Sequence, residues 1–101
     1  MTMKVRLEFQ YFEDCPNHDT LRKNMHLALQ GIENDVELTE VQVVDADTAA
    51  RLGFRGSPTL LINGEDVDGM PAPEETSLSC RVYPNGIPSA KVIRRKVEEA
   101  R

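Results

Sequence analysis

Two cysteines and a histidine carry the most distinctive chemistry of this chain. Cys15 lies in the run YFEDCPNHDT, where an extended segment gives way to a helical pattern. A thiol at a helix start lies near unpaired backbone N–H groups and the positive end of the helix dipole, and both lower its pKa from about 8.5. His18 could lower that pKa further as a cation, or accept the thiol proton when neutral. The run therefore predicts a reactive thiolate.

Each of these residues also has a purely structural interpretation. A cysteine just past a strand is often only a small buried hydrophobe. The nearby carboxylates of Glu13, Asp14 and Asp19 would oppose thiolate formation by like-charge repulsion. For His18 the simpler expectation is a solvated position in the first turn of the helix.

The segments that position these residues alternate between strands and helices. Polar and apolar residues alternate over residues 5–11, and β-branched residues are frequent over residues 36–44, so both segments are predicted to be strands. The pattern after Cys15 predicts a helix with Pro16 at its first position, where the missing N–H is no loss. The first strand is expected to be central, with a polar second face that is thinly covered.

The second half of the chain continues this alternation. The run DADTAARLG predicts a short helix from Asp45 to a stop at Gly53, and Asn63-Gly64 predicts a hairpin turn. Residues 69–86 read as a loop, with an extended piece at LSCRVY, and Ser89 is expected to cap a last helix. The order strand, helix, strand, helix, strand, strand, helix implies parallel pairing closed by an antiparallel hairpin.

Length and composition narrow the function classes. The chain has 101 residues, 40% hydrophobic and 29% charged, which fits one globular domain over residues 1–101. A formal charge of −5 without a basic cluster argues against nucleic-acid binding. The alternating N-terminus is not a signal peptide, and no apolar run is long enough to span a membrane, so a cytoplasmic location is expected. In a cytoplasmic protein, the two cysteines are expected to be functional thiols or inert core residues, and not the disulfide framework typical of secreted proteins.

The run GFRGSPTLLINGEDV, residues 53–67, together with the strand–cysteine–helix start, resembles the thioredoxin superfamily. In that family a cysteine motif faces a loop whose proline is cis, here Gly56-Ser57-Pro58-Thr59. The resemblance implies a βαβαββα fold, a mixed four-stranded sheet with helices on both faces. It also implies that Ser57, Pro58 and Thr59 bind an extended substrate chain. A trans proline that only starts an edge strand is the alternative.

The chain departs from the dithiol members of that family in its cysteine motif and at Asp14, which stands where an aromatic residue often precedes the first cysteine. Its motif is Cys15-Pro16-Asn17-His18, so the usual second cysteine is missing. A single thiol can attack a disulfide but cannot by itself release the mixed disulfide. Release would need glutathione, a partner thiol or Cys80, which could equally be a cysteine packed against the core. Arg81 could support a thiolate or bind substrate, although a lone arginine is more often a surface charge.

Three functions therefore stay open. The leading hypothesis is a thiol–disulfide oxidoreductase or redox sensor that acts on a protein or low-molecular-weight thiol or disulfide, with no metal or cofactor. The runs YFEDCP, GFRGSPT and LSCRVY also resemble those of small bacterial thioredoxin-like proteins, some of which are labelled alkylmercury lyase-like. That resemblance implies that Cys15 and Cys80 of this chain would bind mercury and that Asp14 or Asp19 would supply a proton. The third is a binding module without redox turnover. The sequence predicts no oligomeric state.

Overall fold

The central element of the fold is strand β1 (Val5–Tyr11). The structure, a computed structural model, describes residues 4–101; the first three residues of the stretch expected not to be a signal peptide lie outside this part. Strand β2 (Val36–Gln42) pairs parallel to β1, and β3 (Thr59–Ile62) pairs antiparallel to it. The short β4 (Glu65–Asp66) completes a mixed sheet of order β2-β1-β3-β4. The predicted α/β fold class and the predicted order of elements are confirmed.

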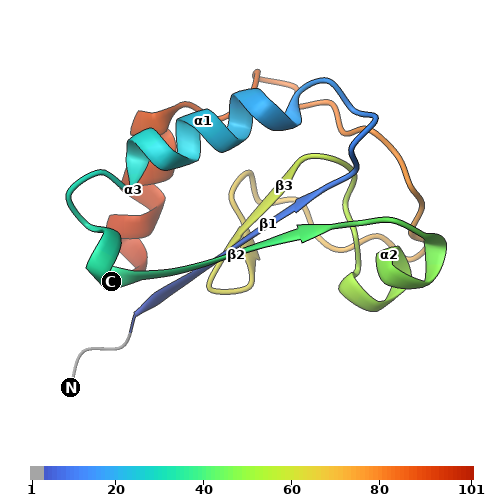
Figure 1. The fold of residues 1–101 in the computed structure, drawn as a ribbon, viewed down its shortest axis with the longest axis horizontal. Helices are drawn as coiled ribbons and strands as arrows, with labels where there is room; N and C mark the ends of the chain where they lie inside the picture. The colour runs from blue at the N-terminus through green and yellow to red at the C-terminus, as the bar shows by residue number, and fades with distance from the viewer. Residues whose placement is uncertain (1–3) are drawn as a thin grey trace.

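Three helices complete the fold of residues 4–101. Helices α1 (His18–Ala28) and α3 (Ala90–Ala100) lie together over one face of the sheet, and α2 (Ala46–Leu52) lies away from them, near the end of β2 (Figure 1). A single 3-10 turn, η1 (Glu33–Asp35), leads into β2. The long segment between β4 and α3 runs past the loop that joins β1 to α1, which brings the second cysteine toward the first (Figure 1).

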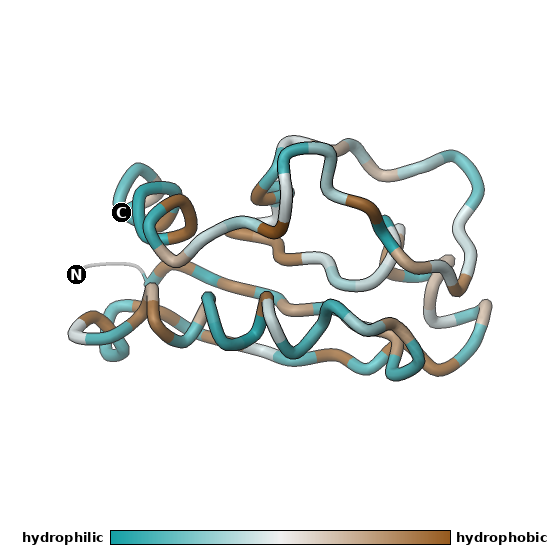
Figure 2. The backbone as a smooth tube through the Cα atoms, turned by 90° about the horizontal axis from the view of Figure 1, so that it is seen from above, coloured by the Kyte–Doolittle hydropathy of each residue, from teal (hydrophilic) through white to brown (hydrophobic). Residues whose placement is uncertain are grey.

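Apolar side chains from β1, β3, α1 and α3 form the main core, because each of these elements turns one apolar face inward. Figure 2 shows hydrophilic and hydrophobic residues side by side along both long helices, as amphipathic helices on a sheet require. A smaller cluster lies around α2. The most deeply buried members of the main core are Leu7, Phe9, Leu21, Met25, Leu60, Ile93 and Val97, and those of the smaller cluster are Val43, Ala49 and Phe54.

Local signals placed most element boundaries correctly. The Asp45 carboxylate accepts a hydrogen bond from the Thr48 N–H at the start of α2, and Gly53 ends that helix with φ 63°. Asn63 is left-handed, with φ 51°, in the predicted hairpin turn, and the Ser89 hydroxyl caps α3 as expected.

The start of α1 was predicted wrongly. Its first helical residue is His18 and its N-cap is Asn17, so Pro16 lies before the helix and not at its first position. The cause is a turn that precedes the helix, closed by a 3.1 Å hydrogen bond from the Cys15 N–H to the Phe12 carbonyl.

The second face of β1 is thinly covered at Arg6 and Glu8, as its polar residues predicted, but it is closely covered at Gln10. Arg6 is exposed, and together with Glu8 it lines an open hollow of about 240 Å³ on this side of the sheet. Gln10, on the same face, is fully buried, and its Oε1 has no hydrogen-bond partner among residues 4–101. Within residues 4–101, no helix has both the length and the apolar character needed to cross a bilayer.

Candidate functional site

Cys15 and Cys80 are joined by a disulfide in the structure. Their Cα atoms are 5.5 Å apart although 65 residues separate them in sequence, and this distance lies in the normal range for a bridged pair. Cys15 is 1% exposed, whereas Cys80 is an exposed residue. The structure therefore represents the oxidised form, and the reactive Cys15 thiolate predicted from sequence would belong to the reduced form.

The backbone around Cys15 places this residue where a negative charge is stabilised. Cys15 lies in the turn before α1, and the Asn17 side chain makes no capping hydrogen bond to the helix. The first N–H groups of α1 are thus left without this side-chain acceptor, and the positive end of the helix dipole points toward the turn. A thiolate released at Cys15 would lie close to that end.

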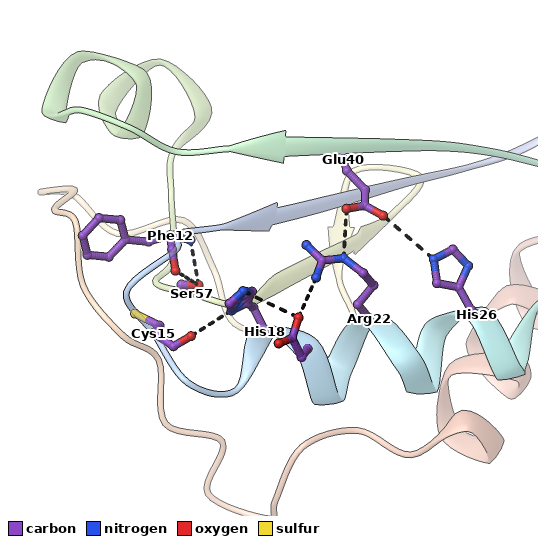
Figure 3. Close-up of polar contacts among 8 residues, drawn as sticks. Phe12, Cys15, His18, Arg22, His26, Glu40 and Ser57 are labelled. Carbon is purple, nitrogen blue, oxygen red and sulfur yellow. Dashed lines mark hydrogen bonds and ion pairs between the residues drawn. The ribbon is translucent and has the colours of Figure 1, made fainter.

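His18 contacts Cys15 through the backbone. Its Nδ1 lies 2.8 Å from the Cys15 carbonyl oxygen, and because a carbonyl only accepts, Nδ1 carries the hydrogen (Figure 3). Its Nε2 lies 3.7 Å from a carboxylate oxygen of Asp19. His18 is 8% exposed, so the expectation of a solvated first-turn residue is wrong.

An aromatic and cationic stack explains this burial. The His18 ring lies parallel to the Tyr11 ring, with centroids 5.3 Å apart and planes 6° apart. The Arg22 guanidinium carbon lies 4.8 Å from the centroid of the Tyr11 ring. The Nε atom of Arg22 donates to the Glu40 carboxylate at 3.0 Å, as Figure 3 shows. The stack fixes His18 at the end of β1 and holds the start of α1 against the sheet.

The proline loop lies directly against the cysteine turn. The Ser57–Pro58 peptide bond is cis, as predicted. The Ser57 hydroxyl accepts a 2.8 Å hydrogen bond from the Phe12 N–H and lies 3.3 Å from the Phe12 carbonyl oxygen (Figure 3). Thr59 is fully buried and donates to the Gly56 carbonyl at 2.6 Å. The two motifs that carried the family resemblance are thus in direct contact.

Residues 79–81, here called the Cys80 segment, pair with the backbone of this proline loop. The Ser57 N–H donates to the Ser79 carbonyl at 2.8 Å, and the Arg81 N–H donates to the Ser57 carbonyl at 2.8 Å. This makes an isolated parallel bridge between Ser57 and Cys80. Both backbone polar groups of Ser57 are already paired, so in the oxidised form the chain's own segment occupies the edge expected to bind substrate.

Arg81 anchors the Cys80 segment to the interior of the protein. Its guanidinium donates to both carboxylate oxygens of Asp66, at 2.6 and 2.7 Å, and the two side chains are only 4% and 1% exposed. Burial alone would raise the pKa of Asp66, but hydrogen bonds from Arg81 and from the Met70 and Asp68 N–H groups outweigh it and lower that pKa. Arg81, expected to contact substrate, is therefore engaged inside the protein.

Tyr83 supplies a second anchor. Its hydroxyl donates a 2.6 Å hydrogen bond to the Pro58 carbonyl, and its ring lies 4.2 Å from the Arg81 guanidinium carbon. Burial raises the pKa of Tyr83, so the phenol stays protonated and remains a donor. The Cys80 segment is therefore held by contacts on its C-terminal side that do not depend on the disulfide.

Sequence reasoning missed Asp66, Tyr83 and Tyr11. Asp66 follows a hairpin turn, where a lone carboxylate usually faces solvent. Tyr83 gave one usable signal, because it lies two residues after Arg81 and alternation would place both on one side of an extended segment. Tyr11 was recognised only as an apolar strand residue.

No group of three or more histidine, cysteine or acidic side chains that could hold a metal ion occurs within residues 4–101. The comparison with protein-family models gave no match, and neither did the comparison with curated proteins. The function of this chain is therefore inferred from its own geometry.

Proposed function

We propose that this protein is a thioredoxin-like thiol–disulfide exchange protein whose redox pair is Cys15 and Cys80. The observation that supports the proposal most strongly is the direct bond between a cysteine in the turn before α1 and a cysteine paired with the proline loop. The missing second cysteine of the Cys15-Pro16-Asn17-His18 motif is replaced in this proposal by Cys80. The mixed disulfide formed by one thiol can then be resolved within the same chain.

The reaction balances with a low-molecular-weight or protein disulfide as co-substrate. The reduced protein gives up two electrons and two protons and forms the Cys15–Cys80 bond, while the co-substrate is cleaved to two thiols. The reverse reaction consumes two thiols and reopens the bond. No metal or cofactor takes part, and the proposed location is the cytoplasm, whose thiols would supply the reductant.

Mercury binding is a second candidate, favoured by the convergence of the two sulfurs. The Cα atoms of Cys15 and Cys80 are 5.5 Å apart in the oxidised form, and after reduction the same two thiols could hold one soft metal ion between them. Cleavage of a carbon–mercury bond is less well supported, because Asp19 is engaged by Arg22 at 2.9 Å and Asp14 is exposed. A mercury titration of the reduced protein tests this candidate. Tight one-to-one binding that needs both Cys15 and Cys80 would support mercury binding by the cysteine pair.

The binding-module hypothesis receives less support. It requires a free backbone edge beside Pro58, and in the oxidised form the Cys80 segment occupies that edge.

Stoichiometric oxidation tests the proposed exchange. The reduced wild-type protein, mixed with a small aromatic disulfide, should release two thiols per chain and end with the Cys15–Cys80 bond. Cys15→Ser and Cys80→Ser should each release one thiol and stop at a mixed disulfide. Release of a single thiol by the wild type, without formation of the internal bond, would refute the proposal.

A further inference from the structure

The two sulfurs of the disulfide belong to residues of very different accessibility. Cys15 is 1% exposed, and His18 and Ser57 beside it are 8% and 1% exposed. Cys80 is exposed, and so is Val82 on the same side of this extended stretch, at 84%. Alternation turns Arg81 and Tyr83 inward and leaves Cys80 on the outer side.

This difference is built into the fold and does not depend on the disulfide alone. The Arg81–Asp66 ion pair, the Tyr83–Pro58 hydrogen bond and the two backbone hydrogen bonds to Ser57 all hold the Cys80 segment. While these contacts persist, an external thiol meets Cys80 first.

The opposite ends of the bond also differ as leaving groups. Thiol–disulfide exchange is faster when the departing sulfur is the more stable thiolate. Cys15 lies in the turn before α1, near the positive end of the helix dipole. Cys80 belongs to an extended segment and reaches this helix start only through its bond to Cys15, so once that bond opens the departing charge is better stabilised on Cys15.

From these observations we infer that Cys80 is the sulfur through which external thiols enter and leave this disulfide. This inference rests on the proposed exchange function and assigns its two roles. An incoming low-molecular-weight thiolate attacks the Cys80 sulfur, forms a mixed disulfide there and expels Cys15 as a thiolate. A second thiolate then attacks the incoming thiol's sulfur and frees Cys80. In the oxidation direction Cys80 attacks the external disulfide, and Cys15 resolves the mixed disulfide.

Mapping the first intermediate tests the inference. Oxidised wild-type protein is mixed with glutathione, quenched with iodoacetamide at several early times, and digested for mass spectrometry. The expected main species carries glutathione on Cys80 and the alkyl group on Cys15. The reverse labelling, or equal amounts of both species at the earliest times, would overturn the inference while leaving the exchange function intact. An unreacted disulfide would overturn both.

Single-cysteine variants give an independent readout. Cys80→Ser leaves Cys15 as the only thiol, and Cys15→Ser leaves Cys80, with rates toward glutathione disulfide expressed per thiolate after each thiol has been titrated. We expect Cys80 to react about tenfold faster or more, because Cys15 needs a local opening of the covering segment. Adding Asp66→Asn to Cys80→Ser should increase the rate at which Cys15 reacts with glutathione disulfide, because the substitution weakens the attachment of the covering segment. A Cys15 as fast as Cys80, or unaffected by Asp66→Asn, would contradict the inference.

Discussion

The buried ion pair between Asp66 and Arg81 gives a quantitative prediction. Asp66→Asn keeps the side-chain shape, removes one charge and leaves the Arg81 guanidinium buried. Removing one partner of a buried pair costs about 3–5 kcal/mol. Asparagine retains one acceptor oxygen for the guanidinium, so we expect a cost of about 2 kcal/mol, below that range.

The cost should appear as a weaker disulfide. In the oxidised protein the bond to Cys15 holds the Cys80 segment in place whether or not Asp66 is charged. In the reduced variant the segment can leave its position and avoid part of the penalty. The oxidised form therefore loses more stability than the reduced form, and about 2 kcal/mol corresponds to a decrease of up to about thirtyfold in the equilibrium constant for forming the bond.

Equilibration in glutathione redox buffers, followed by alkylation and mass spectrometry, measures this constant. Asp68→Asn is the matched control, because it removes the same charge from an exposed residue two positions away. It should leave the constant close to the wild-type value. If Asp66→Asn and Asp68→Asn gave the same constant, the ion pair would have no role in holding Cys80.

The remaining predictions concern stability. Gly56→Ala should lower the free energy of unfolding more than Gly64→Ala. Both glycines have positive φ, but a Cβ at Gly56 would lie 3.0 Å from the Arg81 Cβ, whereas the space around Gly64 is open. Equal losses of unfolding free energy in urea denaturation would argue against tight packing at Gly56. Tyr83→Phe removes one buried hydrogen bond and should cost about 1 kcal/mol in the same assay, and an unchanged midpoint would contradict that contact. The pKa of Asp66 in the folded protein is lowered from its ordinary value of 3.8. The ionised Asp66 carboxylate therefore stabilises the folded state fully above pH 3.8, and this stabilisation is lost as the pH falls through the lowered folded pKa. The unfolding free energies of oxidised wild type and Asp66→Asn should therefore converge in acid, and a constant difference would refute this linkage.

The elements of the fold were predictable because their signals are local. Alternation in β1, the Asp45 cap of α2 and the Asn63 turn each depend on a few neighbouring residues. The start of α1 was misplaced for the same reason, since the turn closed by Phe12 and Cys15 competes with helix formation and gives no clear pattern of its own.

The candidate site was only half predictable because it is built from distant segments. The cysteine and proline motifs indicated Cys15 and Pro58, but no local rule could pair Cys15 with a residue 65 positions away. The alternation of Cys80, Arg81 and Val82 predicts the opposite of the observed burial, because it would normally place the cysteine and the valine inside and the arginine in solvent. The carboxylate of Asp66 reverses this orientation by satisfying a buried guanidinium.

A redox titration of the folded protein tests the central claim most directly. The wild-type chain is equilibrated across glutathione buffers of graded composition, and the Cys15–Cys80 bond and the circular dichroism spectrum are followed together. We predict a reversible transition in which two electrons are transferred per chain while the secondary structure is retained. A bond that opens only when the protein unfolds, or that never forms in oxidising buffer, would contradict the account.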